Sequence, residues 1–279
     1  MSDQVIITVA TTGAWPGKKD NPAIPLTPGE IAADVYECWQ AGAAVAHLHM
    51  RDDQGQGTMD KEKFRETVGL IQEKCDIVLN LTTSGDLKAT DETRMAHLIE
   101  LKPEMASYDC GSMNWGHNDV FYNAPQFLEK LGQVMQANGV KPEVEIFDGG
   151  MIYNSFYYQK KGVLKAPLHY QFVLGAPGGL EATVRNLVFL QSLIPEEATW
   201  SALGIGKGHL PILYAALALG GHIRVGLEDN VFYSKGVLAK NNAEFVARAA
   251  RIVREMNKVP AKPDEARALL GLKTKGERQ

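Results

Sequence analysis

The sequence lacks any apolar run that approaches the ~20 residues a membrane-spanning helix needs. It also lacks an excess of basic residues, since 29 Lys and Arg stand against 33 Asp and Glu, and a net charge of −4 gives no electrostatic footprint for nucleic acid. The first residues, 1–4, have neither the basic nor the apolar region of a signal peptide. We therefore expect a cytoplasmic protein that binds neither membranes nor nucleic acid.

Cysteine is scarce, with Cys38, Cys75 and Cys110 widely spaced. An odd number without close spacing indicates reduced thiols rather than a disulfide framework. Cys110 lies near a predicted strand end and could act as a nucleophile, but a small buried apolar residue is the favoured interpretation. The chain also lacks a linker, a low-complexity tract or an internal repeat. Residues 1–279 are therefore expected to form one domain.

Short apolar segments alternate with segments of helical periodicity in a chain that is 45% hydrophobic and 22% charged, as in an ordinary globular protein. The expected strands are 5–10, 45–49, 77–81, 105–108, 143–147, 170–173, 200–203 and 222–225. The expected helices are 28–41, 61–74, 92–101, 125–138, 151–160, one ending near 193, one ending near 219, and 243–256. This alternation predicts an α/β protein, either a (β/α)8 TIM barrel or a doubly wound open sheet.

Two histidines stand at the end of the second predicted strand, in the segment Val45 to His49. Side chains alternate between the faces of a strand, so His47 and His49 share one face. Two imidazoles side by side form half of a metal site, and the alternative is a pair of hydrogen-bonded core histidines.

The eighth predicted strand ends in carboxylates, at Glu228 and Asp229. Two histidines and one carboxylate with an open coordination position are the ligand set of a catalytic zinc, although iron and manganese also suit it. Neighbouring residues point in opposite directions on an extended backbone, so we assign Glu228 as ligand and Asp229 as general base. The alternative is an acidic pair capping a turn.

Arg224, on the same strand, needs an anion, either Asp229 or a substrate carboxylate. A shared metal favours the barrel, because strands eight, one and two become neighbours only when the sheet closes.

Other polar residues follow the remaining strands, where a barrel places its active site. Hydroxyls and amides at residues 82–84 could bind a carboxylate; Ser107 lies on strand four, Glu145 inside strand five, and Asp148 after the end of strand five. The glycine-rich segment 204–208 follows strand seven and could bind phosphate through helix N-terminal amides, with charge from Lys207; a bare turn explains it equally well. Segment 175–179 allows the same two interpretations.

Several segments together resemble the β-keto acid cleavage enzymes, whose founding activity is 3-keto-5-aminohexanoate cleavage. These segments are ITVATTGA at 7–14, NPAIPLTP at 21–28, AHLHMR at 46–51, PEMAS at 103–107, KPEVEIFD at 141–148 and HIRVGLEDN at 222–230. The resemblance implies a zinc-dependent TIM barrel, with one Zn²⁺ per chain, that reacts a β-keto acid with acetyl-CoA to give acetoacetate and a shortened acyl-CoA. It also implies a homo-oligomer, such as a tetramer.

The resemblance implies a set of residue roles. The metal ligands would be His47, His49 and Glu228, the base Asp229 with Arg224 orienting it, and the residues near the substrate Thr82, Thr83, Ser107 and Glu145. Apart from the resemblance, Trp15 is a further candidate substrate contact, and the position of Gly206 and Lys207 after strand seven makes them the candidate CoA contacts. Trp15 departs from the aminohexanoate-cleaving members, which have an acidic residue there that suits a substrate amine. Trp15 therefore favours an apolar or a quaternary ammonium substituent, unless it only packs the barrel rim.

Two other functions remain open from the residues alone. A zinc hydrolase or aldolase on the same barrel would act without CoA. A protein with a structural zinc would fill four positions with protein ligands, and the sequence offers three good candidates.

Overall fold

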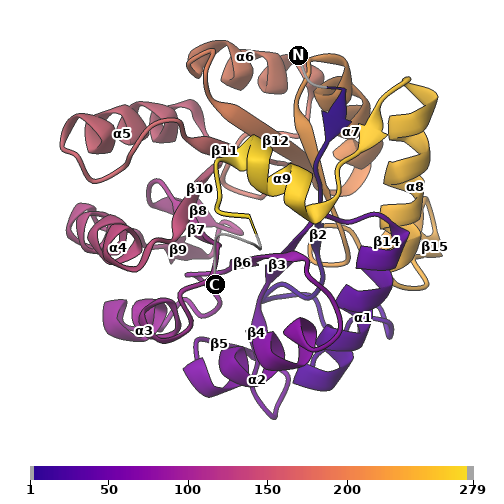
Figure 1. Cartoon of the computed structure of the whole chain (residues 1–279), viewed down its shortest axis with the longest axis horizontal. Helices are drawn as coiled ribbons and strands as arrows, with labels where there is room; N and C mark the ends of the chain where they lie inside the picture. The colour runs from indigo at the N-terminus through magenta and orange to yellow at the C-terminus, as the bar shows by residue number, and fades with distance from the viewer. Residues whose placement is uncertain (1–2, 275–279) are drawn as a thin grey trace.

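A closed barrel of parallel strands forms the centre of the computed structural model, which describes residues 3–274 (Figure 1). In chain order its strands are β2 (Ile7–Ala10), β3 (Val45–Leu48), β6 (Val78–Leu81), β7 (Met105–Asp109), β10 (Lys141–Ile146), β11 (His169–Leu174), β12 (Thr199–Gly204) and β13 (His222–Val225). Each pairs in parallel with the next, and β13 pairs with β2 through Arg224 opposite Thr8. This pairing confirms the predicted barrel and excludes the open sheet.

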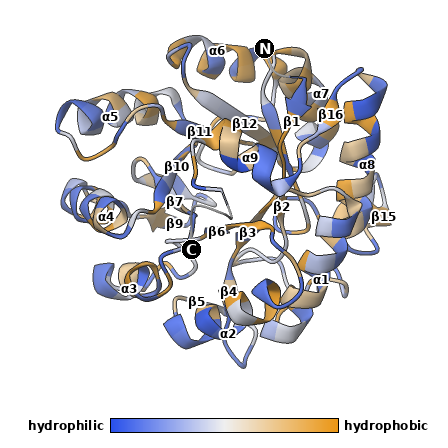
Figure 2. Cartoon of the chain, viewed as in Figure 1, coloured by the Kyte–Doolittle hydropathy of each residue, from blue (hydrophilic) through white to orange (hydrophobic). Residues whose placement is uncertain are grey.

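Helices connect the barrel strands and surround them. They are α1 (Pro28–Ala41), α2 (Lys61–Gln72), α3 (Asp91–Leu101), α4 (Pro125–Asn138), α5 (Gly149–Lys160), α6 (Val184–Leu193), α7 (His209–Ala218) and α8 (Asn242–Glu255), followed by α9 (Pro263–Leu270). Figure 2 shows hydrophilic residues on the outer sides of α3, α4 and α5 and hydrophobic residues along the strands. The helices thus bury an apolar side against the barrel, as amphipathic helices do.

The start of α1 follows directly from its sequence. The Thr27 hydroxyl accepts the Glu30 N–H at 3.2 Å, and the Glu30 carboxylate accepts the Thr27 N–H at 3.0 Å. This capping box satisfies two amides that the helix itself cannot bond, and Pro28 occupies the first helical position. The helix ends at Gly42, whose φ of 115° is costly for a residue with a side chain.

Several short elements depart from the predicted pattern. The strand expected at 5–10 is divided, because β1 (Gln4–Val5) pairs with β16 (Val259–Pro260) outside the barrel. Three antiparallel pairs also occur: β4 (Met50–Arg51) with β5 (Gly57–Thr58), β8 (Met113–Trp115) with β9 (Asp119–Phe121), and β14 (Phe232–Ser234) with β15 (Val237–Leu238). Strands of two or three residues are too short to show a period of two. The predicted frayed end, 273–279, lies mostly outside the described residues.

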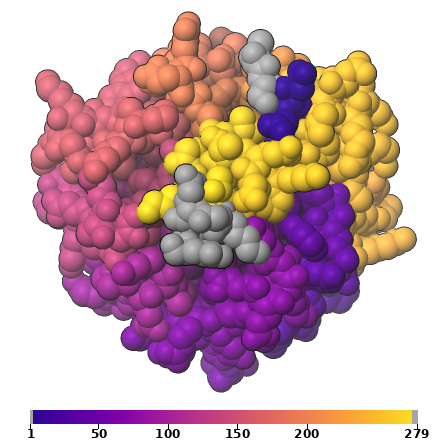
Figure 3. All heavy atoms as spheres, viewed as in Figure 1, coloured from indigo at the N-terminus to yellow at the C-terminus, as the bar shows by residue number. Residues whose placement is uncertain are grey.

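Helix α9 covers the N-terminal end of the barrel. Its residues Ala266 and Leu270 join a small apolar cluster with residues at, or directly before, the starts of several strands: Ile6, Ala44, Val45, Val78 and Met105. Figure 3 shows the residues coloured yellow, which include α9, lying over the centre of this face. The C-terminal end of the barrel is therefore the end available for a site, as in other TIM barrels.

Arg267 of α9 is fully buried, and its guanidinium donates to Glu104 at 2.6 Å, to Asp264 at 2.9 Å and to Asp76 at 3.0 Å. Arg267→Ala would remove a buried guanidinium and its hydrogen bonds to three partly exposed carboxylates, so we expect a loss of about 1.5–3 kcal/mol in the free energy of unfolding. Urea unfolding followed by circular dichroism measures it. Arg251→Ala, which removes an exposed pair with Glu255, serves as the control and should cost less than about 1 kcal/mol. Equal losses in the two variants would contradict this view of α9.

Candidate active site at the C-terminal end of the barrel

Two histidines and a glutamate meet where β3 and β13 end. The Nε2 atoms of His47 and His49 lie 3.1 Å apart, and Glu228 Oε1 lies 3.6 Å from the first and 3.4 Å from the second. His47 and His49 are buried, with exposed fractions of 1% and 6%. Strand β2 separates β3 from β13 in the ring, so closure of the barrel brings these residues together.

Two glycines allow the segment after β13 to approach the end of β2. A Cβ on Gly226, at φ 146°, would lie 2.0 Å from the carbonyl oxygen of Ala10. A Cβ on Gly13, at φ 65°, would lie 2.7 Å from Cγ of Glu228. Both distances are shorter than a side chain tolerates, and both φ values disfavour residues other than glycine. The position of Glu228 therefore depends on glycine at these two sites.

The donor set fits a divalent metal ion. One donor atom from each of His47, His49 and Glu228 lies within 4.8 Å of the others. Glu228 Oε2 is buried and has no hydrogen-bond partner among the described residues. Burial and the nearby Arg224 guanidinium lower the pKa of His47 well below its usual value, which keeps the imidazole neutral. Neutral imidazole and an ionised carboxylate are the forms that bind zinc.

Arg224 connects the carboxylates of the site. Its Nε and Nη2 donate to the two oxygens of Asp229 at 3.1 and 3.0 Å, Nη2 donates to Glu228 at 2.5 Å, and Nη1 donates to Glu145 at 3.3 Å. Burial opposes the charge of Glu228, but His49, Arg224 and His47 outweigh it and hold the Glu228 pKa well below its usual range. Burial raises the pKa of Asp229 to about 6, although Arg224 acts in the opposite direction.

The expectation that Glu228 and Asp229 point in opposite directions is wrong. The chain leaves the extended conformation after β13, and the N–H groups of Asp229 and Asn230 both donate to the carbonyl of Gly226, at 3.2 and 3.0 Å. In this turn both carboxylates face Arg224. The alternation argument applies only within a strand, and the strand ends at Val225.

Further buried acids lie beside the cluster, and of these only Glu145 was predicted from the sequence. Glu143 and Glu145 are two apart on β10 and lie with His47 in a second possible ligand group. Asp109, at the end of β7, shares a hydrogen bond with Glu145. Burial raises the pKa of all three acids, that of Glu143 to about 7. The sequence signal that could have identified Glu143 is the spacing of two between two acids in an otherwise apolar strand. Asp148, by contrast, accepts the Met151 N–H at the start of α5.

The predicted carboxylate-binding residues form a hydrogen-bonded network after β6 and within β7. The Thr83 N–H donates to the Ser107 hydroxyl, and the Thr83 hydroxyl donates to the Ser107 carbonyl, both at 3.0 Å. The Thr82 hydroxyl lies 3.3 Å from that of Ser84. Of these residues, Ser84 lines the cavity beside the metal cluster. A substrate contact for Thr82, Thr83 and Ser107 remains a prediction.

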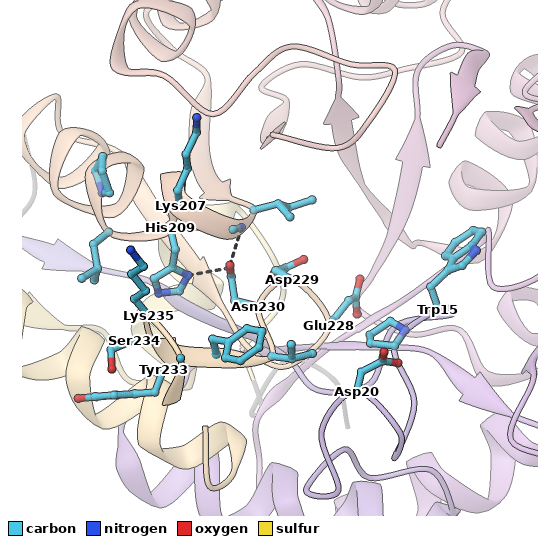
Figure 4. Close-up of a pocket in the computed structure, with 18 residues that line it drawn as sticks. Trp15, Asp20, Lys207, His209, Glu228, Asp229, Asn230, Tyr233, Ser234 and Lys235 are labelled. Carbon is cyan, nitrogen blue, oxygen red and sulfur yellow. Dashed lines mark hydrogen bonds between the residues drawn. The ribbon is translucent and has the colours of Figure 1, made fainter. Parts of the chain in front are cut away.

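A cavity of about 130 Å³ adjoins the cluster, and a groove of about 1200 Å³ continues from it. The two share Trp15, Pro16, Ile205, Glu228 and Asp229. Figure 4 shows the groove extending from Trp15 past Asn230 and Lys207 to the β14–β15 hairpin. The cavity is large enough for a small molecule and the groove for an extended one.

The glycine segments predicted to bind phosphate have other partners. The Gly206 N–H donates to Asn230 Oδ1 at 2.7 Å, so this amide is already bonded, while Lys207 still lines the groove. In segment 175–179 the carbonyl of Pro177 accepts the Gly116 N–H at 3.0 Å. That segment therefore packs against the β8–β9 hairpin.

A closed barrel with a buried polar cluster at its C-terminal end is the architecture of a TIM-barrel enzyme. A family model described as beta-keto acid cleavage enzyme matches residues 4–272. The chain is 43% identical to the 3-keto-5-aminohexanoate cleavage enzyme of Fusobacterium nucleatum, over 98% of this chain and 100% of that protein. It is 36% identical to the 3-oxoadipate:acetyl-CoA acetyltransferase of Cupriavidus necator, over 98% of this chain and 96% of that one. The chain belongs to the beta-keto acid cleavage enzyme family.

A solved structure agrees with this fold. The ternary complex of ObcA with a C4-CoA adduct and oxalate superposes with a TM-score of 0.80, covering 90% of this chain and 68% of that chain. The sequence identity is 22%, so this similarity shows the fold alone.

Proposed function

We propose that this protein reacts a β-keto acid with acetyl-CoA and releases acetoacetate and the CoA thioester of the shortened acid. The observation that carries the proposal is the cluster of His47, His49 and Glu228 beside the Asp229–Arg224 pair. Membership of the family supports it, as does the acetyl-CoA in the name of the Cupriavidus necator relative. The alternative, a metal-dependent hydrolase or aldolase, would need no CoA.

We propose that His47, His49 and Glu228 hold one zinc ion per chain. When bound, such an ion supplies Lewis-acid stabilisation of negative charge on the keto oxygen of the substrate, worth several kcal/mol. Iron or manganese would suit the same ligands, and reconstitution with each metal distinguishes them.

Asp229 is the proposed base that removes a proton from C2 of the keto acid. Its pKa of about 6 leaves the carboxylate largely ionised at neutral pH. Arg224 contacts both of its oxygens and so fixes the direction in which Asp229 accepts the proton. Glu145 lines the same cavity, as does Ser84, whose hydroxyl lies 3.3 Å from that of Thr82. We propose that the network of Thr82, Thr83 and Ser107 contributes to the site of the substrate carboxylate.

The proposed reaction balances without a protein nucleophile. The C2 carbanion attacks the thioester carbonyl of acetyl-CoA, a C–C bond forms, and the CoA thiolate leaves. The thiolate then adds to the original keto carbon, and the bond from that carbon to C2 breaks. The products are the acyl-CoA and acetoacetate, whose C2 takes back a proton. The buried Cys110 has no role in this scheme.

We propose that acetyl-CoA lies in the groove, with Lys207 near its phosphates. The Gly206 amide already donates to Asn230. Gly206 would therefore contribute to the CoA site through the turn that it forms and not through its amide. The groove joins the cavity at Trp15 and Asp229, so a thioester at the junction would lie next to the proposed base.

Lys207→Ala is expected to raise the KM for acetyl-CoA about tenfold with little change in kcat, because one contact to a charged group is lost. Steady-state kinetics with varied acetyl-CoA measures this. Acetyl-pantetheine, which lacks the nucleotide phosphates, should react equally well with both proteins. Lys160→Ala, on the outer surface of α5, is the matched control. An unchanged KM in Lys207→Ala would place the CoA phosphates elsewhere.

The direct test is a set of β-keto acids incubated with acetyl-CoA, in which acetoacetate is measured with and without chelator. Acetoacetate that requires both acetyl-CoA and metal supports the proposal. Chelator-sensitive turnover without acetyl-CoA would establish the hydrolase or aldolase instead.

We also propose that the protein is a cytoplasmic homo-oligomer in which residues 1–279 of each chain form one domain. Within residues 3–274, the structure contains no helix with the length and apolar character required to cross a membrane.

A further inference from the structure

One side of the cavity beside the metal cluster is an aromatic wall, which we define as Trp15, Trp115, Phe121 and Phe147. Trp15 follows β2, Phe147 follows β10, and the other two rings come from the β8–β9 hairpin. Ala14, Val173 and Ile205 complete the apolar lining. Three separate connections of the barrel thus bring apolar groups to one side of a cavity whose other side holds the cluster and its acids.

The rings of the wall contact one another. The centroids of Trp15 and Trp115 are 4.9 Å apart, and those of Trp115 and Phe121 are 5.8 Å apart. Phe147 lies 6.0 Å from Trp115 and 6.3 Å from Phe121, in edge-to-face arrangements. These are the separations of packed aromatic pairs. The four rings therefore form one continuous surface and do not enclose a space between their faces.

The acids that line the cavity are Asp109, Glu145, Glu228 and Asp229. Arg224 donates to the last three, and Asp109 shares a hydrogen bond with Glu145. One oxygen each of Asp109 and Glu228 has no hydrogen-bond partner among the described residues, and the free oxygen of Glu228 belongs to the proposed metal site. A substrate ammonium would lose its water and compete with Arg224 for three of the four carboxylates, whereas an apolar substituent leaves these pairs intact.

A quaternary ammonium needs open aromatic faces around it. In the wall, Trp115, Phe121 and Phe147 pack against each other, and Phe121 and Phe147 are only 6% and 3% exposed. Trp15, at 51% exposed, keeps a large free surface. One such ring gives weak attraction for a cation, whereas the whole wall can cover an apolar group.

We propose that the substrate is a β-keto acid whose substituent on the keto carbon is short, uncharged and apolar, and that the aromatic wall selects it. This inference rests on the proposed function. The cavity of about 130 Å³ is similar in size to cavities that hold a benzene ring and opens into the groove, so it has room for a branched or linear substituent of a few carbons.

Arg94 stabilises the β8–β9 hairpin, which carries two rings of the aromatic wall. It donates to the carbonyl of Thr83 at 2.6 Å, to the carbonyl of Tyr122 at 3.1 Å and to Asn123 Oδ1 at 2.6 Å. Its guanidinium also lies 3.9 Å from the centre of the Phe127 ring. These contacts fix the base of the β8–β9 hairpin to the end of β6, so the wall is formed before substrate binds.

The test compares three β-keto acids of similar size: 3-oxohexanoate, 5-amino-3-oxohexanoate and 3-oxo-4-(trimethylammonio)butanoate. We expect the highest kcat/KM for 3-oxohexanoate, with a gain of about fourfold for each methylene that the wall buries. Trp15→Gln should lower that value about tenfold. Trp15→Glu should lower it further and raise kcat/KM for 5-amino-3-oxohexanoate, because it supplies a carboxylate that Arg224 does not already bind. Since Gln and Glu have the same shape, their difference reports the charge.

Binding separates this inference from the proposed function. Calorimetric titration with the unreactive 3-hydroxy analogues of the three acids measures selection without turnover. Tightest binding of 3-hydroxyhexanoate supports the aromatic wall as an apolar subsite, even if no acid yields acetoacetate and the proposed reaction fails. Preference of the wild-type protein for either ammonium compound, in turnover or in binding, overturns the inference and leaves the reaction intact.

Discussion

Asp229→Asn is expected to lower kcat by about 10²–10⁴-fold, the contribution of a positioned general base. Asparagine keeps the shape of the side chain and can still contact Arg224, but it cannot accept the C2 proton. Metal content should remain at the wild-type level, because Glu228 and the two histidines are unchanged. Steady-state assays and metal analysis of the same protein sample measure both quantities.

A second readout isolates the proton transfer. In D₂O without acetyl-CoA, the wild-type protein should accelerate exchange of the C2 protons of the keto acid, and Asp229→Asn should lose that acceleration. Asp148→Asn is the matched control, because Asp148 caps α5 and asparagine caps equally well. Near-normal exchange and turnover in Asp229→Asn would move the role of base to another group, with Glu145 the next candidate.

Removal of the metal is expected to abolish acetoacetate formation, and added Zn²⁺ should restore it. Without the metal, the cationic side chain at the cavity is Arg224, and its guanidinium already donates to three carboxylates. It is therefore not available to stabilise negative charge on the substrate. His49→Ala should leave an incomplete ligand set and reduce bound metal well below one per chain. Elemental analysis, and the visible spectrum of the Co²⁺-substituted protein, report the site independently of activity.

The control for His49→Ala is His117→Asn, at an exposed turn of the β8–β9 hairpin where φ is 63°. Asparagine tolerates this backbone conformation, so metal content and activity should be unchanged. If His49→Ala bound a full equivalent of metal with unaltered Co²⁺ spectra, the ligand assignment would be incorrect. The second ligand group, with Glu143 and Glu145, would then be the alternative.

The parts of the site that the sequence could predict depend on local geometry. His47 and His49 share a face because alternation is a property of any strand, and α1 begins at Thr27 because a capping box needs only four consecutive residues. The prediction that Arg224 meets Asp229 also agrees with the structure, since both lie within one short segment. Their chemical roles stay predictions until the variants are measured.

Other features depend on contacts between distant segments. Glu143 and Asp109 belong to the site because the closed barrel places β7 and β10 side by side, with Glu145 opposite Asp109. Phosphate binding by the amides of segment 204–208 was one of two interpretations of the sequence, but the Gly206 amide donates to Asn230, from the connection after β13. Trp115 and Phe121 come from a hairpin of two three-residue strands, too short for a sequence pattern to indicate.

The sequence by itself determined the alternation of strands and helices, the shared face of His47 and His49, and the acidic end of the last strand. These follow from backbone periodicity, which acts over a few residues. Only the tertiary structure decided that Glu228 meets the histidines and that Asp229 turns toward Arg224. It also decided that three connections combine into one aromatic wall. The physical reason is closure: the pairing of β13 with β2, and the glycines that let the turn after β13 approach β2, fix distances between residues far apart in the chain.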